Sequence, residues 1–182
     1  GVRSFGLHLN GFVRRPDGIL MWLGRRSRDR LLFPGALDNM VAGGLPHSLG
    51  LEENLVKECA EEAGVSRDLA RKALPVGVVS YNRVAPRGLR RDLLYCYDLQ
   101  LPEDFAPRNM DGEVEEFLLL PLSEVAAIVH ETDEFKLNCN LVVIDFLIRH
   151  GWLEPHSPEY LSLVLGLRRP LEAVDNRLIS GD

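Results

Sequence analysis

The chain alternates between segments with a two-residue hydrophobic period and segments with a helical one. Two strand-like segments, 5–14 and 19–23, open the chain and are separated by the run Pro16-Asp17-Gly18. Proline, aspartate and glycine in succession favour a tight turn, so these segments predict a β-hairpin. A basic loop is expected over 25–30, and a short extended segment over 38–44.

A helix is predicted over 51–63, because apolar residues recur there at every fourth position. These residues are Leu51, Leu55, Cys59 and Ala63. Gly64 follows directly and suits the left-handed conformation that commonly ends a helix. Cys59 belongs to the apolar stripe and is expected to be buried and inert.

The rest of the chain continues the alternation. Further strands are predicted over 75–84, 89–101 and 114–120, and further helices over 66–73, 123–130, 138–150 and 159–167. This order of elements predicts an α/β domain with a mixed β-sheet. We expect residues 1–152 to form the domain and residues 153–182 to add a C-terminal helical extension to it.

Composition narrows the function classes. A net charge of −6 on 182 residues argues against a dedicated nucleic-acid binder. No apolar run reaches the length that crosses a membrane. Three widely spaced cysteines, and histidines without ligand spacing, predict neither a zinc site nor a disulfide framework and fit a reducing compartment. The sequence predicts a cytoplasmic protein that binds neither nucleic acid nor membrane.

Three carboxylates crowd one face of the predicted helix. Glu58, Glu61 and Glu62 stand at positions i, i+3 and i+4. Like charges at this spacing cost roughly 0.2–0.5 kcal/mol per pair on an exposed helix. A hard divalent cation such as Mg²⁺ or Mn²⁺ would reverse that cost, because it prefers oxygen ligands and keeps positions open for phosphate.

The segment from Gly43 to Val65 resembles the Nudix box, G-x5-E-x7-R-E-U-x-E-E-x-G-U, in which U is a bulky aliphatic residue. The residues at their expected places are Gly43, Glu58, Glu61, Glu62, Gly64 and Val65. Three positions depart from the pattern: Leu49 replaces its first Glu, Lys57 replaces its Arg, and Cys59 replaces an aliphatic residue. Glu53, four residues before Lys57, is a candidate partner for that ammonium group.

The resemblance implies a Nudix-type α/β/α sandwich and a metal-dependent hydrolase that cleaves a diphosphate bond by in-line attack of water. It implies that Glu58, Glu61 and Glu62 hold Mg²⁺ or Mn²⁺. A proton acceptor is then required, and the candidates are Glu61, Glu113 and Glu115.

Substrate binding is assigned to residues near the box. Arg26 and Arg30, from a basic cluster in an acidic chain, are candidates for gripping the diphosphate, together with Gly43 and Gly44. A second basic patch, formed by Arg87, Arg90 and Arg91, is expected at the surface or rim. Phe33, Tyr81 and Tyr97 are aromatic residues that suit stacking on a ring, although such residues more often serve ordinary packing. The expected partner is a small-molecule diphosphate, and a homodimer is left open.

Longer motifs, among them LDN-x-VAGGLP, ENLVKECAEEA and DGEVEEF, are similar to the Nudix branch related to fungal thiamine pyrophosphokinase fusions. That likeness implies oxidised thiamine diphosphate analogues as substrates. The alternatives are an ADP-ribose or other nucleoside diphosphate-X hydrolase and a non-catalytic Nudix binding module, which the Leu49 departure favours. An enzyme like isopentenyl diphosphate isomerase is disfavoured, because Ala42 and Gly44 stand where its catalytic Cys and metal-binding His would fall.

Overall fold

The computed structural model describes residues 3–85 and 88–169. The described residues form seven strands and five helices. The strands are β1 (Arg3–Arg15), β2 (Gly18–Arg26), β3 (Leu37–Asn39), β4 (Val41–Gly44), β5 (Leu74–Ala85), β6 (Gly88–Gln100) and β7 (Val114–Pro121). The helices are α1 (Leu51–Ala63), α2 (Arg67–Ala70), α3 (Leu122–Glu131), α4 (Leu137–Arg149) and α5 (Tyr160–Gly166).

All seven strands belong to one mixed sheet. Its central path runs β3-β2-β1-β6-β5, while β4 also pairs with β1 and β7 also pairs with β2. The β1–β6 pair is parallel, and the other strand pairs are antiparallel. Strand β1 is therefore the centre of the sheet and has three partners.

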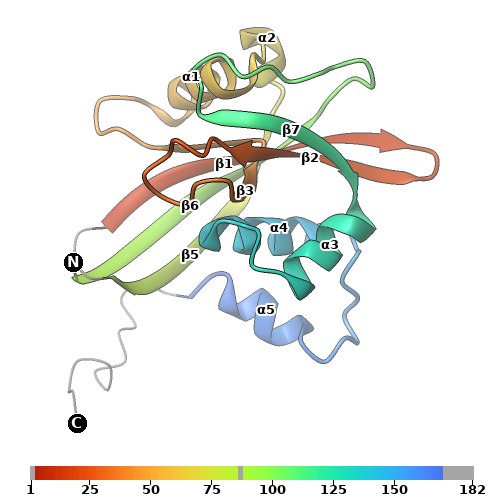
Figure 1. Cartoon of the computed structure of the whole chain (residues 1–182). Coiled ribbons are helices and arrows are strands. Elements are labelled where there is room, and N and C mark those ends of the chain that lie inside the picture. Colours follow the sequence, from red (N-terminus) through yellow and green to blue (C-terminus); the bar gives the residue numbers. More distant parts are fainter. Residues whose placement is uncertain (1–2, 86–87, 170–182) are drawn as a thin grey trace.

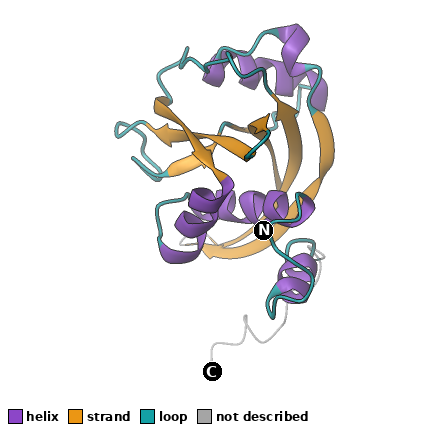
Figure 2. Ribbon diagram, turned by 90° about the vertical axis from the view of Figure 1, so that its right-hand side faces the viewer, coloured by secondary structure: helices purple, strands orange, loops and turns teal. Residues whose placement is uncertain are grey.

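Helices cover both faces of the sheet. Figure 1 shows α1 and α2 on one side and α3, α4 and α5 on the other, and Figure 2 shows the same layers from the side. Leu7 and Leu9 of β1 pack with the apolar stripe of α1, whereas Phe12 packs with Phe146 and its neighbours on α4. Alternate residues of β1 thus supply two separate cores, which confirms the predicted α/β/α sandwich with a mixed sheet.

The box helix begins and ends where the sequence placed it. Gly64 has φ 64° and closes the helix with N–H bonds from Gly64 to Ala60 O and from Val65 to Cys59 O. Cys59 is fully buried, which confirms its predicted place in the core, and burial raises the pKa of its thiol to about 12.

Two predictions about the N-terminal half were wrong in detail. Arg25 and Arg26 lie in β2 and not in a loop, because β2 continues to pair with β3 and β7 at these positions. The extended segment 38–44 is two strands that separate at Met40 and pair with different partners, β3 with β2 and β4 with β1. The chain thereby passes from the edge of β2 to β1 before it reaches the helix α1.

The C-terminal segment returns to the sheet edge after α5. The backbone N–H of Ser80 donates to the carbonyl of Leu167 at 2.9 Å, and Arg168 forms a bridge with Ser80 on β5. Residues 170–182 of the predicted extension lie outside the described residues, as does Arg87. None of the helices within 3–85 and 88–169 has the length and apolar character needed to cross a membrane.

Candidate active site

The acidic face of α1 meets the short strand β4. Glu62 has 7% of its surface exposed, and its Oε2 atom accepts a hydrogen bond from the backbone N–H of Ala42 at 2.8 Å. Burial raises the pKa of Glu62 to about 8; the negative charges of Asp38, Glu58 and Glu113 add to the rise, and the bond from Ala42 opposes it. Three further carboxylates therefore act against ionisation of Glu62, a repulsion that a bound cation would relieve.

Glu58 lies directly against the backbone of β4. A Cβ atom added at Gly43 would come within 2.5 Å of the Glu58 Cδ atom and 2.7 Å of its Oε2 atom. The glycine therefore leaves the space that the carboxylate occupies. Gly44, the next residue of the strand, has open space at the same position.

Lys57 bridges the carboxylates of Glu58 and Glu61. Its Nζ atom lies 2.7 Å from Glu61 Oε2 and 3.2 Å from Glu58 Oε1, so the predicted pairing with Glu53 was wrong. The i,i+4 bond to Glu61 follows from the helix itself. Glu52, in the first turn of the same helix, pairs with Arg71 of α2 at 3.0 Å.

These residues fit a hard divalent cation. Glu58, Glu61 and Glu62 offer carboxylate oxygens on one helix face. Neighbouring negative charges oppose ionisation of the buried Glu62, and Gly43 leaves room, which any larger residue would fill, for the Glu58 carboxylate. The ammonium group of Lys57 lies between Glu58 and Glu61 and bonds to both. The ligand atoms of the three glutamates are farther apart than those of a second, buried cluster around Asp38.

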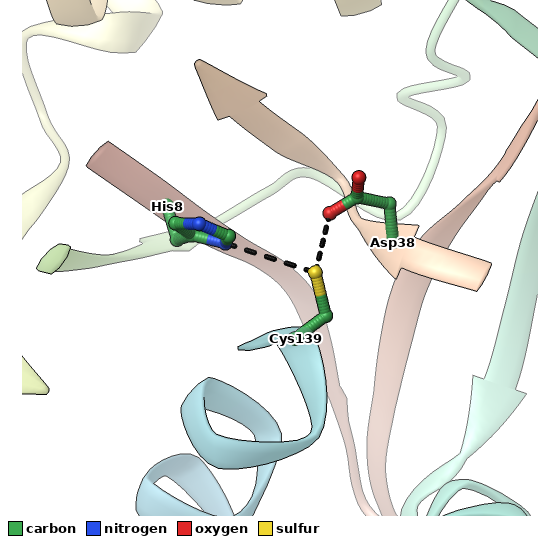
Figure 3. Close-up of side chains that lie close together, drawn as sticks. All are labelled: His8, Asp38 and Cys139. Carbon is green, nitrogen blue, oxygen red and sulfur yellow. Dashed lines mark hydrogen bonds between the residues drawn. The ribbon is translucent and has the colours of Figure 1, made fainter. Parts of the chain in front are cut away.

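That cluster consists of His8, Asp38 and Cys139. Within the described part of the chain it is the one set of three whose candidate ligand atoms all lie within 4.8 Å of one another. Figure 3 shows the Cys139 thiol between the other two side chains, and its Sγ atom lies 2.6 Å from Asp38 Oδ1. His8 comes from β1, Asp38 from β3 and Cys139 from α4, so no spacing along the sequence indicated that they meet.

The chemistry of the cluster is that of a hydrogen-bonded network and not of a metal site. Asp38 already pairs with Arg26 at 2.9 Å and Lys136 at 3.0 Å. Burial lowers the pKa of His8 to about 4 and raises that of the Cys139 thiol well above its usual value. The two neighbouring cations, Arg26 and Lys136, would repel a metal ion, and a protonated thiol is a poor ligand for one.

A cavity of about 330 Å³ lies on the side of β1 that faces α4. Its lining includes the predicted residues Arg26, Arg30, Gly43, Gly44 and Glu113. It also includes residues that the sequence did not assign to a site, among them His8, Lys136, Asn138, Arg83 and Asp92. A smaller hollow next to it is lined by Glu62 and Asp38 and shares Arg26, Ala42 and Glu113 with the cavity. Arg26, Ala42 and Glu113 thus connect the cavity to the hollow that reaches Glu62 on the acidic helix.

The two candidate bases before and on β7 are separated. Glu113 lines the cavity, and its Oε1 atom lies 2.6 Å from Arg30. Glu115 is exposed and pairs at 3.6 Å with Arg28, which is also exposed. Only Glu113 is therefore placed beside Arg26 and Arg30 at the cavity.

The aromatic candidates divide in the same way. Phe33 and Tyr81 line the cavity, whereas Tyr97 is buried in the core under α1. Arg90, expected at a surface or rim, also lines the cavity. Phe33 has φ 52°, the one non-glycine residue in the described ranges with a positive φ.

The chain is similar in sequence to known proteins. A family model of the NUDIX domain matches residues 6–140. Nudix hydrolase 20, chloroplastic, of Arabidopsis thaliana is 52% identical over 168 residues, which cover 92% of this chain and 45% of that protein. The yeast protein YJR142W of Saccharomyces cerevisiae is 38% identical over 186 residues, covering 94% of this chain and 54% of that protein. The chain spans about half the length of these curated relatives.

Solved structures share the fold at low sequence identity. The NUDIX domain of Shewanella oneidensis NrtR, solved in complex with ADP ribose, has a TM-score of 0.64 and 16% identity, covering 82% of this chain and 89% of that one. DR0079 from Deinococcus radiodurans has a TM-score of 0.58 and 21% identity, covering 78% of this chain and 82% of that one.

The Arabidopsis relative is chloroplastic by name, so the cytoplasmic location stays a prediction. Because the NUDIX match extends over most of its length, this chain belongs to the NUDIX domain family.

Proposed function

We propose that this chain is a metal-dependent hydrolase that cleaves the diphosphate bond of a small molecule. The observation that carries the proposal is the position of Glu62, a buried carboxylate whose ionisation three other carboxylates oppose, directly beside a cavity lined by cations. Acidic groups for a cation and basic groups for phosphate are the two requirements of phosphoryl chemistry. Membership of the NUDIX domain family supports the same reaction class.

Glu58, Glu61 and Glu62 would hold Mg²⁺ or Mn²⁺, which when bound polarises the diphosphate and lowers the pKa of a coordinated water. Lys57, which bridges Glu58 and Glu61, would have to turn away from them. Its side chain is 43% exposed, so this movement costs little packing.

The basic residues of the cavity would bind and neutralise the phosphates. Arg26 and Lys136 are fixed by their shared partner Asp38, and Arg30 is held by Glu113. A phosphate that competes for Arg30 would free the carboxylate of Glu113 to accept the proton of the attacking water. Glu61 remains the alternative acceptor, because it is half exposed on the same helix as Glu58 and Glu62.

Two substrate classes have support. The resemblance of the sequence to the branch of the thiamine pyrophosphokinase fusions favours oxidised thiamine diphosphate analogues. The fold similarity to the NrtR domain, which was solved with ADP ribose, favours ADP-ribose or another nucleoside diphosphate-X. Phe33 and Tyr81 in the cavity lining suit an aromatic ring of either kind.

The test is a hydrolysis screen with Mg²⁺ or Mn²⁺ against oxothiamine and oxythiamine diphosphates, thiamine diphosphate and ADP-ribose. Glu62→Gln should lower the rate by about 100-fold or more while the fold is retained. Glu52→Gln is the control, because Glu52 lies on the same helix but pairs with Arg71. Tight binding without phosphate release would identify a binding module instead, and equal rates for the two variants would remove the acidic helix from the mechanism.

A further inference from the structure

The floor of the cavity is formed by residues that alternate along three neighbouring strands. They are Ser4, Gly6 and His8 on β1, Arg90, Asp92 and Leu94 on β6, and Tyr81 and Arg83 on β5. Successive residues of a strand point to opposite faces, so alternate positions in paired strands share one face of the sheet. The pairing confirms this arrangement, because Ser4 and Tyr81 are both opposite Asp92.

One pair in this floor brings two positive charges together. Arg83 on β5 lies directly opposite Arg90 on β6. Like charges at directly opposed positions of an antiparallel pair destabilise it. A chain with a net charge of −6 thus places two arginines opposite each other in the lining of the cavity.

A neighbouring carboxylate, that of Asp92, compensates the positive charge of the arginine pair only in part. The Arg90 Nη2 atom lies 3.7 Å from Asp92 Oδ1, and the same carboxylate accepts a hydrogen bond from the Ser4 hydroxyl. Arg83 is half-buried, and within residues 3–85 and 88–169 no carboxylate forms an ion pair with it. The pair therefore retains a net positive charge.

The pair lies at the other end of the cavity from His8 and the Asp38 cluster. His8, beside Asp38 and Lys136, is paired with Cys96, and Arg90 stands six residues earlier on the same strand. At the usual rise of a strand, these positions are roughly 20 Å apart. Gly6 and Leu94 lie between them on the cavity floor, so the cavity is an elongated groove with cations at both ends.

We propose that Arg83 and Arg90 bind a second anionic group, which the organic part of the substrate carries in addition to the diphosphate. The site selects diphosphates whose organic moiety bears a further phosphate monoester or carboxylate. Guanidinium groups bind both anions through charge-assisted hydrogen bonds. The inference rests on the proposed hydrolase function and adds a substrate class to it.

The test compares substrates that differ by a single anionic group. ADP-ribose against its 2′-phosphate, and NADH against NADPH, add a phosphate monoester, while UDP-glucose against UDP-glucuronate adds a carboxylate. We expect kcat/KM to favour the anionic member of at least one pair by about tenfold. The double variant Arg83→Gln/Arg90→Gln should bring that ratio close to one, and Arg67→Gln, which removes an exposed charge on α2 outside the cavity, should preserve it.

A binding measurement separates failure of this inference from failure of the hydrolase proposal. Calorimetry in EDTA should show adenosine 2′,5′-bisphosphate binding more tightly than AMP, with the difference lost in the double variant. That result without any hydrolysis would support the anion site and reject the hydrolase. Equal kcat/KM values within every substrate pair, or a preference that survives in the double variant, would overturn the anion site.

Discussion

The Glu58 carboxylate occupies the space where a side chain at Gly43 would begin, with its Cδ atom 2.5 Å from an added Cβ. Gly43→Ala should therefore displace Glu58 and weaken Mn²⁺ binding by about tenfold, since one of three carboxylate donors is moved. Calorimetric titration of Mn²⁺ into the two proteins measures this difference. Gly44→Ala is the matched control, because its added methyl group meets nothing within 4 Å. Identical Mn²⁺ affinity in Gly43→Ala and wild type would show that Glu58 is no ligand.

Glu113 and Glu115 provide a second matched pair. Glu113→Gln should lower kcat by about 100-fold or more, as expected for loss of a general base. Glu115→Gln should change it little, because this residue is exposed and paired with Arg28 away from the cavity. Steady-state kinetics on the best substrate of the screen decides between them. If Glu113→Gln stays fully active, the proton acceptor is Glu61 or another group.

Asp38 is the shared anchor of two cations of the cavity. Asp38→Asn should destabilise the fold by about 3 kcal/mol, because it leaves Arg26 and Lys136 largely buried without a counter-charge. Urea unfolding gives the free energy of unfolding directly. Glu116→Gln removes an exposed partner of Arg25 and should cost less than about 1 kcal/mol. Equal losses in the two variants would contradict the structural role of Asp38.

The buried imidazole of His8 makes stability depend on pH. Burial and the charge of Lys136 lower the pKa of His8 to about 4. The charge of Asp38 and the hydrogen bond with Asn39 raise this pKa, but by less. Between pH 6.5 and 4 the unfolded chain therefore binds more protons at His8 than the folded chain does. The contribution of the neutral His8 to the free energy of unfolding is complete above pH 6.5 and is lost as the pH falls from 6.5 to 4. A shift of this size corresponds to about 3 kcal/mol at pH 4.

Glu62 acts in the opposite direction, because its pKa is raised to about 8 and its carboxyl binds a proton more readily in the folded chain. The informative quantity is consequently the difference between wild type and His8→Gln. Urea unfolding at pH 7 and pH 4 should show the wild type losing stability relative to the variant. Parallel pH profiles would mean that His8 is not held neutral in the folded state.

Local patterns predicted the elements well. The limits of α1, the turn at Gly18 and the left-handed Gly64 follow from residues within a few positions of one another. Strand β2 was predicted too short, because the pairing that extends it to Arg26 comes from β3 and β7. Such pairing depends on partners distant in the sequence, and no local pattern encodes it.

The sequence by itself determined which residues share a helix face, because the spacing of Glu58, Glu61 and Glu62 fixes their direction once the helix forms. Only the tertiary structure decided what surrounds that face. Asp38 meets Lys136 across 98 positions and Cys139 across 101, and the Arg83–Arg90 pair reaches the cavity through strand register. The burial, charge and pKa of these groups arise from contacts between distant segments, which exist only after the sheet and its two helical layers have assembled.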